Sequence, residues 1–345
     1  MDGLEDQAEA GLRRNLDQLY THETVQIKHS SRDSVITHFC QALSNPTSPL
    51  VVRKLALRSG ISSVGLQLLQ TTLFKMRREG NVLMEELEFV CLQDTNTLLA
   101  AILCCRLAGI TRLSLKNYNA RILRINRDTI SETIRSGLTM TDHPSVPVLE
   151  GDNDNQDGNV GENLEGQNPR NTIVELDYLE IANYPIGVDG AQILQEAVSS
   201  LKTLKLVDCD LRSDSANCIA KIIRTSPSLE KLDLSYNRHY LGSPITREMT
   251  VKTLVQKGLK HNLSLLFLEM RKHDGSSNSS RALDLSKINQ QLDINRFLRR
   301  NTVDQPRDLL ALPPSLWPVL LARVSAKPAA LHLFLQDTVA ALFAR

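Results

Sequence analysis

The sequence predicts an α/β solenoid: a curved horseshoe with a parallel sheet on its concave side, helices on its convex side and a helical C-terminal cap. The spacing Leu-x-x-Leu-x-Leu occurs at residues 201–206 and 229–234, with fourth positions 28 residues apart, and a copy ending in Ile occurs at 176–181. Apolar residues at helical spacing follow each copy. A period of roughly 20–29 residues with this spacing indicates stacked repeats, each burying its apolar face against its neighbours.

Each repeat should contain a short strand, a turn and a helix that returns the chain to the next parallel strand. In the strand, the leucines point into the core and the residues between them point to solvent, because successive side chains alternate between the two faces. The same spacing, in a weaker form, predicts further strands at residues 25–27, 52–57, 84–89, 110–115 and 263–268.

Apolar stripes predict the returning helices. The stripes are Ile36, Phe39, Cys40 and Leu43; Leu66, Leu69 and Leu73; Leu98, Ala101, Ile102 and Cys105; Ala191, Leu194 and Val198; Ala216, Ile219, Ala220 and Ile223; and Val251, Leu254, Val255 and Leu259. Ser213 is placed to cap the helix that carries the fifth stripe. Two apolar stretches near the C-terminus, the first starting at Pro313-Pro314 and the second at residues 331–343, predict the helices of the cap.

The repeats are interrupted in the middle of the chain, where fourth positions lie 66 residues apart. Residues 129–134 predict a helix there, and residues 138–140 a degenerate strand. Residues 150–168 contain six acidic residues and no basic one, so they cannot bury a core and are expected to be disordered. They form either a tolerated loop insertion or an acidic arm that meets a basic partner. The predicted organisation is repeats over 1–142, an acidic insertion over 143–171, repeats over 172–274, a flexible loop over 275–282 and a helical cap over 283–345.

Composition excludes several classes of function. The net charge of +1 and the aromatic content of 4% give no reason to expect nucleic acid or an anionic membrane as the partner. No stretch approaches the length of a membrane-spanning helix, and the first residues lack a secretory signal. None of the cysteines forms a C-x-x-C pair, so we expect buried reduced thiols. A cytoplasmic protein, or a nuclear one, is expected.

Catalytic motifs are absent from the sequence. It has no phosphate-binding loop, dinucleotide fingerprint, nucleophile elbow or H-E-x-x-H pair, and the eight histidines are scattered without partners at ligand spacing. The sequence therefore predicts a protein that is not an enzyme and uses no cofactor or metal.

The repeats resemble the ribonuclease-inhibitor-like leucine-rich repeats, an intracellular class with repeats near 28 residues and helices on the convex side. The resemblance covers roughly residues 50–270, and Cys209 and Asn237 occupy the position at which the family places Cys or Asn. It implies that the side chain of this turn residue bonds backbone groups left open where the strand ends. Residues 291–317 resemble the terminus of eukaryotic proteins of this class, and this part of the resemblance brings no biochemical activity with it.

The concave face is the candidate binding surface for another protein, because its charges are mixed and a nucleic-acid groove would be basic. Early strands alternate basic, acidic and basic residues along this face. The candidate contact residues are Arg112, Lys116, Tyr178, Glu180, Lys205, Val207, Lys231, Asp233, Tyr236, Leu265, Phe267 and Met270. Val207, Tyr236, Leu265, Phe267 and Met270 form an apolar patch, which is either a binding hot spot or the seat of the C-terminal cap.

The most direct interpretation is a non-catalytic scaffold, monomeric in isolation, that binds a protein partner. Other functions stay open. Residues 312–317, followed by Leu320 and Val324, loosely resemble the start of an F-box, which would make the chain a substrate receptor of a ubiquitin ligase. One branch of this repeat class activates GTPases. A nuclease inhibitor fits less well, because the face lacks the aromatic and acidic density that such a function implies.

Overall fold

The computed structural model describes residues 24–28, 30, 32–45, 52–80, 84–92, 94–118, 127–139, 175–197, 200–237, 244–271, 285–300 and 316–325. The protein has an α/β fold with one eight-stranded sheet in which every neighbouring pair is parallel and consecutive in the sequence. The strands are β1 (Thr24–Ile27), β2 (Lys54–Leu57), β3 (Glu86–Val90), β4 (Arg112–Lys116), β5 (Tyr178–Ala182), β6 (Thr203–Val207), β7 (Lys231–Asp233) and β8 (Phe267–Glu269).

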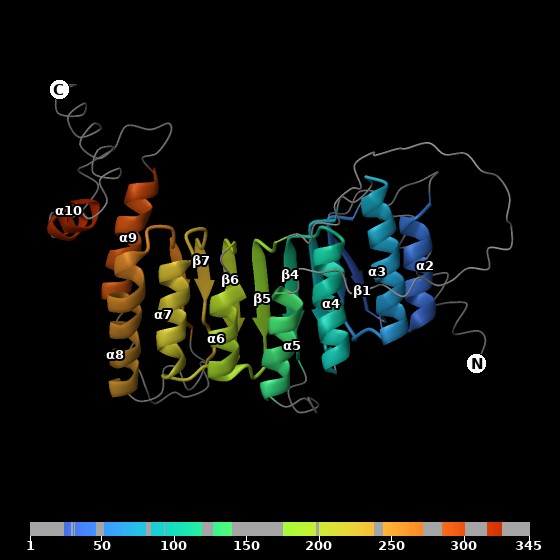
Figure 1. The fold of residues 1–345 in the computed structure, drawn as a ribbon, viewed down its shortest axis with the longest axis horizontal. Helices are drawn as coiled ribbons and strands as arrows, with labels where there is room; N and C mark the ends of the chain where they lie inside the picture. Colours follow the sequence, from blue (N-terminus) through green and yellow to red (C-terminus); the bar gives the residue numbers. More distant parts are fainter. Residues whose placement is uncertain are drawn as a thin grey trace, which may run out of the picture.

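A helix follows each strand from β1 to β7, because parallel strands need a crossover to bring the chain back. The helices are α2 (Asp33–Leu43), α3 (Ser63–Arg78), α4 (Thr95–Leu107), α5 (Arg127–Thr139), α6 (Gly187–Ala197), α7 (Ser215–Thr225), α8 (Pro244–Thr253), α9 (Ser286–Arg300) and α10 (Trp317–Ser325). Figure 1 shows α2 to α8 side by side along one face of the sheet. In the part of the chain that the structure describes, no helix combines the length and apolar character needed to cross a membrane.

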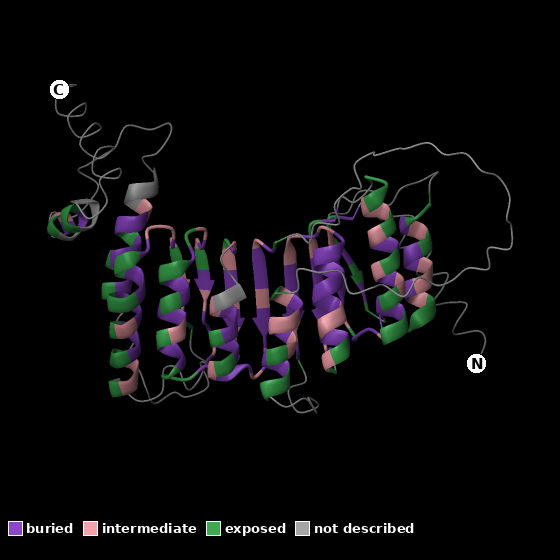
Figure 2. Ribbon diagram, viewed as in Figure 1, coloured by how far each residue is buried: buried purple, intermediate pink, exposed green. Residues whose placement is uncertain are grey.

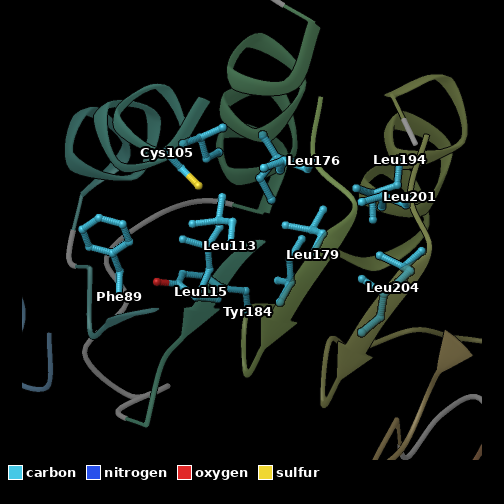
Figure 3. Close-up of a cluster of buried hydrophobic side chains, with 14 of the residues drawn as sticks. Phe89, Cys105, Leu113, Leu115, Leu176, Leu179, Tyr184, Leu194, Leu201 and Leu204 are labelled. Carbon is cyan, nitrogen blue, oxygen red and sulfur yellow. The ribbon is translucent and has the colours of Figure 1, made fainter. Parts of the chain in front are cut away.

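The core lies between the sheet and this layer of helices. Leu113, Leu179 and Leu204 stand opposite one another in neighbouring strands and are almost completely buried. They point toward the helices, where Cys105 and Leu194 lie (Figure 3). Figure 2 shows buried residues along the strands and exposed residues on the outer sides of the helices. The alternation in the strands and the helical stripes therefore meet in one continuous core.

The predicted helical stripes are confirmed in α2, α3, α4 and α7, whose stripe residues are buried as predicted. The predicted N-cap of α7 is wrong by one residue. Asp214, not Ser213, precedes the helix, and its carboxylate accepts a hydrogen bond of 2.9 Å from the backbone N–H of Ser215. A carboxylate is favoured at this position because it also interacts with the positive end of the helix dipole.

The predicted strand at residues 138–140 is wrong, because Leu138 belongs to α5. It follows Ile130 and Ile134 at intervals of four residues, so it continues the apolar stripe of that helix and packs against the core. Strand β4 pairs directly with β5, and the sheet is continuous across the interruption in the repeats. The predicted acidic insertion at 143–171 and the predicted loop at 275–282 both lie outside the described residues.

The last predicted strand is displaced by two residues. Leu268, not Leu266, pairs with Leu232, so Leu265 and Met270 take the core positions held by Leu229 and Leu234 in the preceding unit. The sequence Leu-Ser-Leu-Leu-Phe-Leu-Glu-Met places apolar residues inside in either register, so spacing alone could not decide between them. A π-helical turn (Leu254–Gly258) and a 3-10 turn (Leu259–His261) lengthen the connection before β8.

Asn237 connects neighbouring units where the strands end. Its side-chain oxygen accepts hydrogen bonds from the backbone N–H groups of Cys209 and Leu211, at 2.8 and 3.2 Å. Its amide nitrogen donates to the carbonyl oxygens of Leu206 and Leu234, at 2.7 and 2.9 Å. With a longer contact of 3.3 Å to the Ser235 carbonyl oxygen, one buried side chain thus bonds five backbone groups, two donors and three acceptors, as the resemblance implied for this turn position. The backbone just before this position has positive φ in several units, at Cys91, Asn183, Asp208 and Tyr236.

The six cysteines are free thiols, as predicted. Cys40, Cys104, Cys105 and Cys209 are buried, whereas Cys91 and Cys218 are partly exposed. Burial raises the pKa of the Cys104 thiol to about 12, so this group is uncharged at physiological pH and packs as a small apolar residue.

Candidate protein-binding face

The sheet surface opposite the helices, which we call the open face, presents two rows of side chains across β2 to β8. Strand alternation puts these residues on the side away from the leucine core. The register aligns Lys54, Glu86, Arg112, Tyr178, Thr203, Lys231 and Phe267 in the first row, and Ala56, Glu88, Ser114, Glu180, Lys205, Asp233 and Glu269 in the second. Parallel pairing in a single register therefore holds these groups at fixed spacing.

Glu88 is the centre of an ion-pair cluster on the first half of this face. Its side chain is only 2% exposed, and its carboxylate lies 2.6 Å from Arg58, 3.2 Å from Lys54 and 3.6 Å from Lys116. Glu86 extends the cluster, with Lys54 at 2.6 Å and Arg112 at 3.1 Å. Charges on or next to three adjacent strands, β2, β3 and β4, are thus matched to one another within the protein.

Glu180 joins this cluster from β5. Lys116 lies 3.3 Å from its carboxylate, and the hydroxyl groups of Ser114 and Tyr178 donate hydrogen bonds to it at 2.8 and 2.9 Å. Burial by itself would raise the pKa of Glu180, but the ammonium group and these hydrogen bonds outweigh it, so that the pKa is lowered from 4.5. Glu180 is therefore ionised at neutral pH, and its contacts with Lys116 and Ser114 connect β5 to β4.

We expect the stability that Glu180 contributes to depend on pH. Because its pKa is lower in the folded state than in the unfolded state, the contribution is present above the unfolded pKa and is lost as pH falls through the folded pKa. The difference in unfolding free energy between the wild type and Glu180→Gln should be largest near pH 7 and should shrink toward about pH 3. Urea unfolding at both pH values measures it; a difference that stays constant would contradict this account.

Tyr178 lies under two cationic side chains at the centre of the open face. The Arg112 guanidinium is 4.4 Å from the centre of its ring and the Lys205 ammonium is 5.6 Å from it. Tyr178 is 8% exposed, so the predicted contact residue is on the correct face but largely covered. Burial and the neighbouring Glu180 carboxylate raise the pKa of its hydroxyl, which therefore stays protonated and donates to Glu180.

The other end of the open face carries a half-exposed aromatic ring. Phe267 in β8 is 50% exposed, with Lys231 5.6 Å and Arg296 of α9 5.0 Å from its ring centre. Helix α9 is fixed beside β8 by hydrogen bonds from Asn295 and Arg296 to the carbonyl oxygens of Leu265 and Leu266, at 2.7 and 2.9 Å. This helix therefore packs beyond the last strand and leaves much of Phe267 accessible.

The predicted contact residues have different outcomes. Leu265 and Met270 are wrong as surface residues: Leu265 is fully buried and Met270 is 7% exposed, because the register of β8 places both in the core. The remaining predicted residues lie on the open face or at its strand ends: Arg112, Lys116, Tyr178, Glu180, Lys205, Val207, Lys231, Asp233, Tyr236 and Phe267.

The prediction omitted Glu86, Glu88 and Arg296 from the set of contact residues. The alternation of basic and acidic residues in early strands was a signal for the two glutamates, since opposite charges face each other across β2, β3 and β4. Local spacing carried no signal for Arg296, because α9 reaches β8 only through tertiary packing.

The described side chains of this face interact through ion pairs, hydrogen bonds and cation–ring contacts. Within the described ranges, no three His, Cys, Asp or Glu side chains are grouped in a way that could hold a metal ion. No protein-family model matches the chain.

Proposed function

We propose that the chain is a leucine-rich-repeat solenoid of the ribonuclease-inhibitor-like class that binds another protein through the open face of its sheet. It acts as a non-catalytic scaffold inside the cell, in the cytoplasm or the nucleus, and uses no cofactor. The consecutive parallel strands, the helix after each strand and the Asn237 hydrogen bonds support the repeat assignment.

The observation that carries the binding proposal is the preformed order of the open face. Ion pairs at 2.6–3.6 Å already fix the side chains around Glu88, so a partner loses little free energy in ordering them. Four cations and three carboxylates form this cluster, namely Lys54, Arg58, Arg112 and Lys116 with Glu86, Glu88 and Glu180. Such balanced charge favours a protein partner over nucleic acid or a membrane.

Site-specific photocrosslinking tests this proposal. A benzoylphenylalanine residue at Thr203, between Tyr178 and Lys231 in the first row, should capture a specific protein from native lysate. The same residue at Lys221, exposed on α7, should not capture that protein. Capture of the same protein from both positions, or from Lys221 alone, would contradict binding through the open face.

Phe267→Asp should then weaken binding of the captured protein by at least about tenfold, since an aromatic ring at an interface core often dominates affinity. The melting temperature should change little, because the ring is half exposed. Val64→Asp is the matched control: Val64 is 62% exposed on α3, on the helix side. Equal loss of affinity in both variants would count against the proposal.

A further inference from the structure

The two halves of the open face differ in how their cations are matched. In the half centred on Glu88, every basic side chain of the ion-pair cluster lies within 4 Å of a carboxylate. Lys205 and Lys231, in the other half, lie over the rings of Tyr178 and Phe267 instead. Among the described residues, neither lysine forms an ion pair.

Nearby carboxylates have closer partners than the two lysines. Glu180 faces Lys205 and interacts with its charge, but it pairs with Lys116 at 3.3 Å and accepts hydrogen bonds from Ser114 and Tyr178. Asp233 faces Lys205 across the strands but accepts a hydrogen bond of 2.9 Å from the backbone N–H of Ser235. Glu269 pairs with Arg271, and Asp293 pairs with Arg296 at 2.9 Å. The charge of the two lysines is thus available to a ligand, beside a half-exposed aromatic ring.

We infer that this end of the open face binds an acidic segment of the partner protein that carries a large apolar residue next to its carboxylates. The inference rests on the proposed function and specifies the chemistry of the partner. Carboxylates would accept hydrogen bonds from Lys205 and Lys231, and the apolar side chain would pack on Phe267. The ring beneath each lysine stabilises its positive charge. The N–H groups of the ammonium can still donate hydrogen bonds to a carboxylate.

The spacing of these groups defines the segment further. Lys205 and Lys231 are one strand and two residues apart, which places their Cα atoms roughly 8 Å from each other. Alternate residues of an extended chain are separated by about 7 Å, so carboxylates at positions i and i+2 can reach both lysines. Phe267 faces Lys231 on the next strand, so the apolar residue would adjoin the carboxylate that binds Lys231.

The chain itself contains an acidic stretch, residues 150–168, with six acidic residues and no basic one. This stretch has no aromatic residue, and Val160 and Leu164 are its only large apolar residues. An aromatic anchor can stack on the exposed ring of Phe267 and contact its flanking cations, which Val160 and Leu164 cannot do, so we assign the site to a partner protein.

A phage-displayed library of random peptides, panned on the full-length chain, tests the inference. Enriched peptides should contain Asp or Glu at alternate positions beside an aromatic residue. Synthetic copies should bind the variant Lys205→Gln/Lys231→Gln/Phe267→Ala at least about thirtyfold more weakly in fluorescence anisotropy. The control Lys221→Gln/Lys252→Gln/Ile245→Ala also removes two lysine charges and one large apolar side chain, at exposed positions of α7 and α8, and should bind normally.

Other outcomes separate the inference from the function on which it rests. Enriched peptides that lack acidic residues, but lose affinity in the open-face variant, would overturn the inference and leave open-face binding intact. Peptides that bind the open-face variant and Thr203→Arg as well as the wild type would overturn both. If replacing the six acidic residues of 150–168 by Asn or Gln increases peptide affinity about tenfold, the chain's own stretch occupies the site and the assignment to a partner is wrong.

Discussion

Replacing Asn237 with alanine should lower the free energy of unfolding by about 3 kcal/mol or more, because it leaves several buried backbone groups without hydrogen bonds. Asn237 is 2% exposed and bonds the backbone N–H groups of Cys209 and Leu211 and the carbonyl oxygens of Leu206 and Leu234. A buried polar group that loses its partner costs about 1–3 kcal/mol. Water entering the gap would recover part of this, so the loss should be smaller than the sum over all the backbone groups that Asn237 bonds.

The shift of the urea unfolding midpoint measures this effect. Asn217→Ala is the matched control, because Asn217 is exposed on α7 and its side chain accepts one hydrogen bond, of 2.9 Å, from Lys257. We expect a change within about 0.5 kcal/mol there, partly because alanine favours the helix. Similar midpoints for Asn237→Ala and the wild type would show that the strand ends do not depend on this side chain.

The second large effect is expected for Glu88→Ala, which should cost about 2 kcal/mol of stability. Removing one partner from a buried ion pair is usually strongly destabilising, because the remaining charge is left without compensation. Here the cost is moderated by solvent, since the side chains of Arg58, Lys54 and Lys116 are 31%, 31% and 18% exposed. Three cations would nevertheless lose their common carboxylate.

Glu132→Ala provides the comparison for this change. Glu132 pairs with Arg135 on the surface of α5 at 3.5 Å, and its side chain is 63% exposed. Exposed pairs contribute roughly 0–1 kcal/mol, and salt screens them, so this substitution should have little effect. The decisive observation is the difference between the two variants in urea unfolding at moderate ionic strength; equal losses would mean that the Glu88 cluster is no stronger than a surface ion pair.

Much of the α/β fold could be predicted from the sequence because two periods are superimposed in each unit. Leucines at alternate positions mark the strand, and stripes such as Ala216, Ile219 and Ile223 mark the helix that follows. The prediction was wrong where a residue fits both patterns. Leu138 was assigned to a strand although it also continues the stripe of α5, and the leucine-rich sequence before β8 was compatible with two registers.

The open face could be predicted less completely for a physical reason. A strand pattern shows which side chains leave the core, and this was sufficient to select Arg112, Lys205 and Lys231. Whether an exposed-side residue stays accessible depends on its neighbours across the sheet: the ring of Tyr178 is covered by cations, whereas that of Phe267 is half exposed. These contacts join residues from different units, so no local pattern specifies them.

Lysine acetylation footprinting on the complex with the captured protein tests open-face binding most directly. Lys205 and Lys231 report on the open face, and Lys221 and Lys252 report on the exposed side of the helices. Binding through the open face predicts that labelling of Lys205 and Lys231 slows by roughly fivefold or more, because an interface core excludes water, while the helix lysines react as in the free chain. Protection of Lys221 and Lys252, with Lys205 and Lys231 unchanged, would contradict it.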